Sequence, residues 1–413
     1  MKILHISSSD GGGGAAIAAL RIHLSLASSN IDSSMFVAKK TSDQKNVFSF
    51  ESKFMKLYSL VKTGIGAKIS KIQKTENETI HSISFIPSRI ENFINKSDYD
   101  LIHLHWVQGE MMSIESIGRI KKPLIWTLHD NWAFSGSEHL PLNEFDLRYQ
   151  EGYFKRNKPK GHNFLDFDRW CWERKKKNWL ESIPIVCPSN WLADCAKKSA
   201  LMKSWSVSTI PNPLDTNIFK PVIQNSARKV FNLPLNKKII LFGSMDGTNN
   251  KNKGWDLLSK ALNLVYSKIP NSIAVVFGQS SSDKKENVNM PIFYVGKLVD
   301  PQSLAVLYSA ADITVVPSKF ESFGQTASES SSCGTPVVAF DSSGLKDVIS
   351  HDETGFLVEP YNCSYLAESI IEILVNEKKM KSFKSACRKR AIKLWSYQTI
   401  SNKYSALYSE ILK

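Results

Sequence analysis

The sequence has few cysteines and no long apolar run, and each absence excludes a class of protein. Its six cysteines form no C-x-x-C pair and no zinc-finger spacing. This pattern predicts reduced, packed thiols in a cytoplasmic protein. No stretch approaches the roughly 20 apolar residues that span a bilayer, and the N-terminal MKILHISSSDGG lacks the apolar core of a signal peptide. We therefore expect a cytoplasmic protein, either soluble or attached to the inner face of the cell membrane.

The motifs of nucleic-acid and metal binding are also missing. There is no helix-turn-helix, zinc-finger or RNP-like pattern, so nucleic acid is not an expected partner despite the formal net charge of +14. There is no D-x-D motif in a nucleotide-binding setting and no His/Cys cluster, so we expect no metal and no other cofactor. The positive charge fits an anionic lipid surface, a diphosphate-bearing substrate or a lysine-rich solubilising surface.

Length and periodicity predict two α/β domains. A chain of 413 residues is too long for one compact core. Strand-like runs such as KILHIS, PLIWTLH, IILFGS and AVVFGQ alternate with helical segments, as a doubly wound parallel sheet requires. The proline-rich STIPNPLDTNIFKP indicates a connection between domains. We expect domains over residues 1–213 and 214–390, and a C-terminal helix over 391–413 that crosses back to the first domain.

Four consecutive glycines, Gly11 to Gly14, follow the first predicted strand. Glycine permits positive φ and lets an anion approach the free N–H groups of a helix N-terminus. A Rossmann fingerprint would need a third spaced glycine where Ile17 stands, so dinucleotide binding is not expected. We predict ligand contact at Gly12, Gly13 and Gly14, with a plain tight turn as the alternative. The next helix is predicted over residues 15–27, with one apolar face made by Ile17, Leu20, Leu24 and Ala27.

Two glutamates, Glu321 and Glu329, bracket the stretch ESFGQTASE between the strand-like runs ITVVPS and TPVVAF. Two carboxylates at the mouth of an α/β sheet suit a site that holds several hydroxyl groups. The serine, phenylalanine and glycine after Glu321 would let backbone N–H groups approach an anion. The stretch therefore predicts a nucleotide-sugar site.

ESFGQTASE with the following SSSCGTPVVAFDSSGLKDVISHDETGFLVEP resembles the C-terminal signature of retaining glycosyltransferases of family 4. WTLHDNWAFSG, IPNPLD and KGWDLLSKAL are similar to the same family, so the resemblance spans nearly the whole chain. It implies the GT-B fold, two Rossmann-like domains facing each other across a cleft. It also implies transfer of a sugar, with retention, from a nucleoside diphosphate-sugar to a saccharide acceptor. The charge and the analogy favour a lipid-linked acceptor in cell-surface polysaccharide or lipopolysaccharide assembly. A nucleotide-sugar epimerase of the same fold is the alternative function.

The resemblance gives the candidate residues their roles. It implies that Glu321 contacts hydroxyls of the donor sugar, that Glu329 holds the ribose hydroxyls, and that Lys253 neutralises the diphosphate. The family usually adds an arginine upstream of this lysine, but MDGTNNKNK contains none. Lys251 is the candidate replacement, although a lysine cannot form a bidentate clamp.

The first domain supplies two further candidates. By resemblance, His129 lines the sugar pocket, whereas Asp130 either contacts acceptor hydroxyls or caps a helix. The candidate catalytic residues are His129, Lys253 and Glu321. The candidate donor-binding residues are Gly12, Gly13, Gly14, Ser244, Lys253, Phe323, Gly324, Gln325, Thr326 and Glu329. Asp130 is the candidate acceptor-binding residue.

Two segments fall outside the regular α/β alternation. Residues 134–170 are polar, aromatic and rich in glycine and proline, which predicts a long loop or lid. Residues 53–74, KFMKLYSLVKTGIGAKISKIQK, interleave lysines with apolar residues at helical spacing. This stretch either lies on an anionic membrane or forms an ordinary surface helix. Gly64 and Gly66 argue against one long helix there, and a membrane contact would use Lys56, Lys62 and Lys68.

Overall fold

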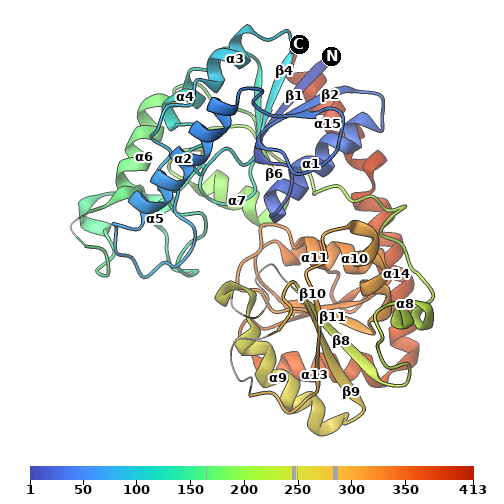
Figure 1. Ribbon diagram of the computed structural model, residues 1–413. Helices are drawn as coiled ribbons and strands as arrows, with labels where there is room; N and C mark the ends of the chain where they lie inside the picture. The colour runs from blue at the N-terminus through green and yellow to red at the C-terminus, as the bar shows by residue number, and fades with distance from the viewer. Residues whose placement is uncertain (164, 244–247, 249, 282–286) are drawn as a thin grey trace. The chain divides into compact units, whose positions relative to one another are not determined.

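The computed structural model describes residues 1–163, 165–243, 248, 250–281 and 287–413, which form two compact units. Unit 1 holds Met1–Pro211 together with Ile400–Lys413, and unit 2 holds Asn212–Thr399. The chain therefore enters unit 2 at Asn212 and returns at Ile400, whereas the sequence pattern placed these steps at residues 214 and 391. In Figure 1 the returning segment is the red helix α15 beside the blue strand β1.

Unit 1 is built on a parallel sheet of seven strands in the order β3-β2-β1-β4-β5-β6-β7. The strands are β1 (Lys2–Ser9), β2 (Asp32–Lys39), β3 (Val47–Phe48), β4 (Leu101–Leu104), β5 (Leu124–Thr127), β6 (Ile185–Cys187) and β7 (Val207–Thr209). The helices are α1 (Gly14–Ala27), α2 (Lys53–Ser70), α3 (Ile90–Lys96), α4 (Ile114–Gly118), α5 (Arg148–Glu151), α6 (Phe167–Asn178), α7 (Asn190–Lys198) and α15 (Tyr397–Ile411), with a 3-10 turn η1 (Lys155–Asn157). The strand order reverses between β1 and β4, where ligands bind in open α/β sheets.

Helix α15 belongs to the core of unit 1 although it comes last in the chain. Tyr404 and Tyr408 are fully buried in one apolar cluster with residues of β1, β4, β5 and β6. The Tyr408 hydroxyl bonds His103 at 2.7 Å, and the Tyr404 hydroxyl lies 3.1 Å from Thr127 Oγ1. Since both partners are buried side chains of the central strands, unit 1 needs this helix to satisfy them.

Unit 2 repeats the plan with six parallel strands in the order β10-β9-β8-β11-β12-β13. The strands are β8 (Lys238–Gly243), β9 (Ser272–Phe277), β10 (Ile292–Gly296), β11 (Ile313–Val316), β12 (Val337–Phe340) and β13 (Gly355–Val358). The helical segments are α8 (Gln224–Val230), the 3-10 turn η3 (Lys251–Lys253), α9 (Trp255–Lys268), α10 (Pro301–Ala310), α11 (Gln325–Ser332), α12 (Leu345–Val348), α13 (Cys363–Val375) and α14 (Glu377–Trp395). Here the order reverses between β8 and β11, which pair in parallel.

The sequence pattern gave the wrong buried face for the first helix. Ile17, Leu20 and Leu24 are only partly buried in α1, whereas Ala18 and Ile22 are fully buried. The helix is apolar or small on most of its surface, because GAAIAALRIHLSLA contains a single charge. Periodicity cannot select one face when several faces are equally apolar.

Helix α2 is continuous through Gly64 and Gly66, contrary to the sequence-based expectation. A Cβ at Gly66 would lie 2.3 Å from Glu110 Cγ, so the glycine lets the helix pass close to that buried carboxylate. Glu110 in turn accepts hydrogen bonds from the backbone N–H groups of Ser84, Phe85 and Ile86. Tertiary packing therefore outweighs the intrinsic helix cost of glycine.

The C-terminal helical run is divided twice. The sequence predicts one helical run over residues 365–413 with a break near Trp395, and this break is confirmed at Ser396, which follows the end of α14. A second break at Asn376 was missed, although its side chain caps α14 by accepting from the Lys379 N–H. The described residues of the segment 134–170 have little regular structure apart from α5, η1 and the first turn of α6.

The sequence predicts packed, reduced cysteines and no stretch that spans a bilayer. All six cysteines lie among the described residues as free thiols, and five of them are buried. Within the described part of the chain, no helix combines the length and hydropathy that crossing a bilayer needs.

Candidate active site

In unit 2, the structure brings two of the three candidate catalytic side chains together. Lys253 follows β8 and Glu321 follows β11, and the carboxyl ends of these paired strands meet at the reversal point of the sheet. Lys253 Nζ lies 2.5 Å from Glu321 Oε1, and both side chains are partly exposed. The pair thus presents one ammonium and one carboxylate at the position where an α/β sheet binds ligands.

Asn252 holds the two loops in register. Its side chain donates to the Phe320 carbonyl at 2.9 Å and accepts from the Phe320 N–H at 3.1 Å. Its own carbonyl accepts from the Lys319 N–H at 2.8 Å. The next residue but one, Gly254, has φ of +69°, and a Cβ there would lie 2.0 Å from the Pro317 carbonyl oxygen. Sequence reasoning missed Asn252, because its partners lie far along the chain.

Helix α11 begins directly behind the carboxylate loop. Gly324 has φ of +96°, and a Cβ there would lie 2.7 Å from Leu345 Cδ2, so the turn requires glycine. The Phe323 ring is buried against Trp395, so only its backbone is available to a ligand. Gln325 and Thr326 form the first turn of α11, whose N–H groups and dipole favour an anion.

Glu329 lies deeper in unit 2 than Glu321. It is 7% exposed, and its Oε2 accepts a hydrogen bond of 2.8 Å from the buried Tyr308 hydroxyl. Burial and the neighbouring Glu329 carboxylate raise the pKa of Tyr308 well above its ordinary value, so the phenol stays protonated and donates. The sequence analysis did not predict a role for Tyr308. The helical pattern of PQSLAVLYSAAD shows that Tyr308 is on a helix but does not show that it bonds Glu329.

Two candidates of unit 2, Ser244 and Lys251, remain. Ser244 lies outside the described residues. Lys251, the candidate replacement for the missing arginine, opens the turn η3 and is exposed.

In unit 1, the glycine run forms an open turn at the start of α1. Gly12 has φ of +83°, and a Cβ at Gly12 or Gly13 would meet nothing within 4 Å. Gly13 is the N-cap and supplies no side-chain hydrogen bond, and α1 begins at Gly14. The Asp10 carboxylate, just before the glycines, accepts hydrogen bonds from Thr41 and Ser42 and so fixes the turn. Backbone N–H groups can therefore be approached closely here.

His129 ends a row of hydrogen-bonded histidines. Its Nε2 lies 3.2 Å from His105 Nδ1, and His105 Nε2 lies 2.8 Å from His5 Nδ1. Burial lowers the pKa of His129 to about 4 and holds those of His5 and His105 well below the ordinary value, so all three are neutral at pH 7. His5 Nε2 has no partner among the described residues.

The hydrogen bonds of the row have a preferred donor-to-acceptor direction. A buried lone pair without a partner costs less than a buried N–H without one, so His5 donates to His105 and His105 donates to His129. The remaining N–H of His129 is then on Nδ1, where it can donate to a ligand oxygen. The pattern DLIHLHW places His103 and His105 on one face of a strand but gives no sign of the row, because His103 bonds Tyr408 and Thr127.

Asp130 is held by unit 1 itself. Its Oδ2 accepts from Trp106 Nε1 at 2.8 Å and pairs with His139 Nδ1 at 2.6 Å, and its Oδ1 accepts from the Trp132 N–H at 3.0 Å. Burial opposes ionisation, but the charge and hydrogen bond of His139 outweigh it, so the pKa of Asp130 is lowered. The sequence left open whether Asp130 contacts the acceptor or caps a helix; among the described residues it caps no helix, because the Trp132 N–H lies in a turn.

Among the described residues, two groups of side chains have metal-ligand spacing, with their donor atoms within 4.8 Å of one another. They are His5, His103 and His105, and His162, Asp166 and Asp168. In the first group, both nitrogens of His103 are engaged by Tyr408 and Thr127, and both nitrogens of His105 by neighbouring histidines. In the second, Arg148 already pairs with Asp166 at 2.9 Å. Neither group therefore has the open set of ligand atoms that a metal would need.

Two family descriptions match the chain, one in each half. "Glycosyltransferase Family 4" matches residues 12–218, and "Glycosyl transferases group 1" matches residues 224–390. A D-inositol 3-phosphate glycosyltransferase of Thermobispora bispora is 29% identical over 221 residues, which cover 50% of this chain and 51% of that protein. One from Arthrobacter sp. is 27% identical over 329 residues, 74% of this chain and 70% of that protein. The match to the former thus spans about half of its length.

Solved structures share the fold over the whole chain. Sucrose-phosphate synthase from Thermosynechococcus elongatus superposes with a TM-score of 0.66 at 19% identity, covering 100% of this chain and 99% of that one. HepE from Anabaena, solved with UDP and glucose, gives 0.66 at 17% identity and covers 99% of both chains. WaaG, a glycosyltransferase involved in lipopolysaccharide biosynthesis, gives 0.62 at 14% identity, with 98% and 99% covered.

Proposed function

The chain belongs to glycosyltransferase family 4 and has the GT-B fold, and from this premise we propose that it transfers a sugar from a nucleoside diphosphate-sugar to a saccharide acceptor. The observation that carries the proposal is the Lys253–Glu321 pair in front of α11. An ammonium and helix-terminal amides favour a diphosphate, and a carboxylate favours sugar hydroxyls.

Transfer proceeds with retention in this proposal. The acceptor hydroxyl attacks the anomeric carbon on the face from which the diphosphate leaves, and the bond from that carbon to the phosphate oxygen breaks. The departing oxygen takes the hydroxyl proton. Lys253 neutralises the negative charge that builds on the leaving group, and it needs no reorganisation because Glu321 and Asn252 already hold its loop.

We expect one nucleotide sugar out of a panel to stabilise the purified protein. A ligand present at 100 times its Kd adds about 2.7 kcal/mol, which raises the Tm by roughly 3 °C for a protein of this size. Differential scanning fluorimetry identifies the donor, and release of nucleoside diphosphate that depends on added acceptor identifies transfer. Accumulation of free epimer without acceptor would instead establish an epimerase, and no stabilisation by any nucleotide sugar would refute donor binding.

We also propose that α2 docks on an anionic membrane, which would bring the enzyme to a lipid-linked acceptor. The outward side of α2 carries five exposed apolar residues. They are Phe54, Leu57, Leu60, Val61 and Ile65. Exposed lysines, among them Lys53, Lys56 and Lys68, accompany them. Contiguous apolar side chains with a basic surround are the pattern of interfacial helices.

The sequence-based assignment of Lys62 to the membrane contact was wrong. Lys62 is 2% exposed and donates to the Met111 carbonyl at 2.9 Å. Burial lowers its pKa to about 8, although Glu110 acts in the opposite direction. Lys62 therefore attaches α2 to the rest of unit 1 and does not reach a lipid surface.

Replacing Leu57 and Leu60 with serine is expected to abolish sedimentation with vesicles that contain anionic phospholipid. Lys56→Glu with Lys68→Glu should have the same effect and should match the loss caused by high salt. The matched control is Leu180→Ser, which removes an even more exposed leucine from a part of unit 1 outside α2. Undiminished sedimentation of the α2 variants would contradict membrane docking and leave the transfer reaction unaffected.

A further inference from the structure

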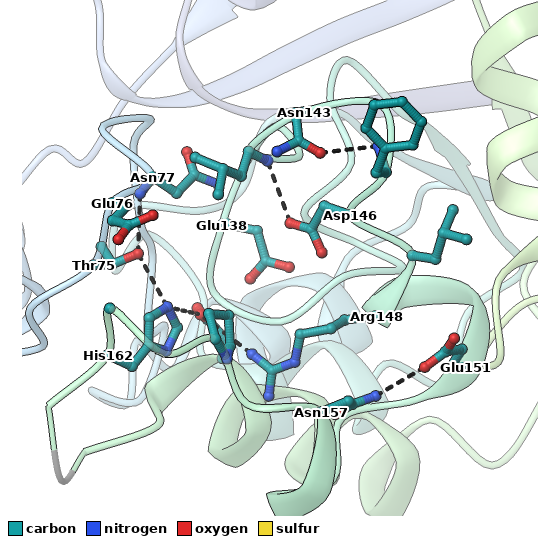
Figure 2. Close-up of a pocket in the computed structure, with 16 residues that line it drawn as sticks. Thr75, Glu76, Asn77, Glu138, Asn143, Asp146, Arg148, Glu151, Asn157 and His162 are labelled. Carbon is teal, nitrogen blue, oxygen red and sulfur yellow. Dashed lines mark hydrogen bonds and ion pairs between the residues drawn. The ribbon is translucent and has the colours of Figure 1, made fainter.

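Unit 1 contains a cavity of about 400 Å³ on the side of the segment 138–168. Figure 2 shows the Glu138 carboxyl near its centre, with Arg148 and His162 along one side and Asn143 and Asp146 along another. Its volume lies in the range of small-molecule sites. None of the candidate site residues predicted from the sequence lines it.

Three side chains that line this cavity have a buried polar atom without a partner among the described residues. These atoms are Glu138 Oε2, Arg148 Nε and His162 Nδ1. All three side chains are more than nine-tenths buried. Buried polar atoms are nearly always hydrogen-bonded in folded proteins, so three such atoms in one cavity indicate a missing ligand.

The other atoms of these side chains are firmly held, which fixes the unpartnered ones in place. Glu138 Oε1 accepts from the Tyr153 hydroxyl. Arg148 pairs with Asp166 at 2.9 Å, and its guanidinium lies 4.5 Å from the centre of the Tyr153 ring. His162 Nε2 lies 3.0 Å from Thr75 Oγ1. The cavity is therefore a built site with little freedom to close on itself.

The cavity offers donors and acceptors together. Burial, with the charge and hydrogen bond of the nearby Asp168 carboxylate, raises the pKa of Glu138 well above its ordinary value, so this carboxyl keeps its proton, for which Asp168 is one acceptor. Arg148 Nε donates as well, while Asp146 and Glu151 on the wall accept. Phe145 lines the cavity and is 81% exposed, so its ring face is free to cover a ligand.

The charges and the aromatic ring that line the cavity favour some ligand classes over others. The acidic residues on the wall outnumber Arg148, which disfavours phosphates and anionic sugars. A divalent cation is disfavoured because Arg148 already contacts Asp166 at 2.9 Å and Asp168 at 3.8 Å. A neutral polyol with one apolar ring face satisfies the unpartnered donors and acceptors and packs against Phe145.

The cavity also adjoins the candidate acceptor residue. Glu138 faces the cavity, and the next residue, His139, bonds Asp130 at 2.6 Å. We propose that this cavity binds a neutral pyranose unit of the acceptor saccharide. The assignment to the acceptor rests on the proposed transfer reaction, whereas the binding of a pyranose does not.

Saturation-transfer difference NMR on the full-length protein without donor tests the binding. The probes are the methyl glycosides of glucose, galactose, mannose and N-acetylglucosamine. At least one is expected to bind, and Phe145→Ala is expected to weaken it by roughly tenfold because the ring contact is lost. Leu180→Ala is the matched control, since this leucine is 85% exposed, lies in the same unit and belongs to neither the cavity nor α2.

A second variant tests the polar wall. Arg148→Lys keeps a positive charge beside Asp166 but removes the Nε donor, and it too should weaken the glycoside. Binding that is absent, or that is equal in wild type and both variants, would overturn the proposal, as would stabilisation by Zn²⁺ or Mn²⁺ without glycoside binding. Transfer with unchanged acceptor KM in Phe145→Ala removes only this inference, whereas glycoside binding without any transfer removes only the proposed function.

Discussion

Lys253→Ala is expected to lower kcat by about 10²–10³-fold, because the transition state loses the charge that faces the leaving diphosphate. The variant should fold normally, since Lys253 is partly exposed and its backbone position depends on Asn252. Glu321 keeps contact with solvent after the change and needs no buried counter-ion. Steady-state kinetics with the identified donor measures the loss.

The matched control for this experiment is Lys260→Ala, which removes an exposed lysine from α9 in the same unit. Lys253→Arg keeps the charge and should recover part of the rate. Turnover like that of the wild type in Lys253→Ala would contradict the assigned role. Glu329→Ala is a less specific test of donor binding, because it also leaves the Tyr308 hydroxyl without its acceptor.

Lys175→Met is expected to reduce the free energy of unfolding by about 3–5 kcal/mol, the usual cost of removing one partner from a buried charged network. Lys175 is fully buried in α6 and donates to the carbonyls of Trp132, Ser135 and Gly136. Its ammonium also lies 3.8 Å from the centre of the Trp132 ring. Without it, the Ser135 and Gly136 carbonyls lose the ammonium donor, whereas the Trp132 carbonyl keeps the Ser135 N–H at 3.3 Å.

Thermal or urea unfolding measures this effect, and a Tm lowered by roughly 10 °C is expected. Lys177→Met, an exposed lysine of the same helix, should change nothing. Burial lowers the pKa of Lys175 to about 7, whereas the unfolded chain holds the proton to a pH of about 10.4. The unfolded state therefore binds more protons between these values, and the wild type should gain stability over Lys175→Met as the pH rises from about 7 to about 10. A difference that shrinks over this range would contradict the buried-ammonium account.

The sequence could predict the elements whose information is local. Apolar runs such as KIILFG and SIAVVF are typical of buried strands of a parallel sheet, and ESFGQTASE carries its turn glycine and helix start within nine letters. The break at Ser396 was accessible for the same reason, whereas the combination of Glu321 with Lys253, 68 residues apart, came from the resemblance to the family. The roles assigned to those glutamates and to Lys253 stay predictions.

Features that depend on distant partners could not be predicted. Gly66 is required by Glu110, and the burial of Lys62 follows from the Met111 carbonyl. Asn252 is specified by the loop at Phe320, more than sixty residues away. No local period records such pairs, because each residue is ordinary for its own segment and acquires its role only through tertiary contact.

The placement of α15 has a consequence for synthesis on the ribosome. Unit 1 cannot bury Tyr404 and Tyr408 against His103 and Thr127 until residues 400–413 have been made. All of unit 2 is translated in the interval, which takes roughly 10–40 s at ordinary elongation rates. The N-terminal part of the nascent chain must remain incomplete for that time, so unit 2 is the first autonomous folding unit to emerge whole, and chaperones would meet an unfinished unit 1.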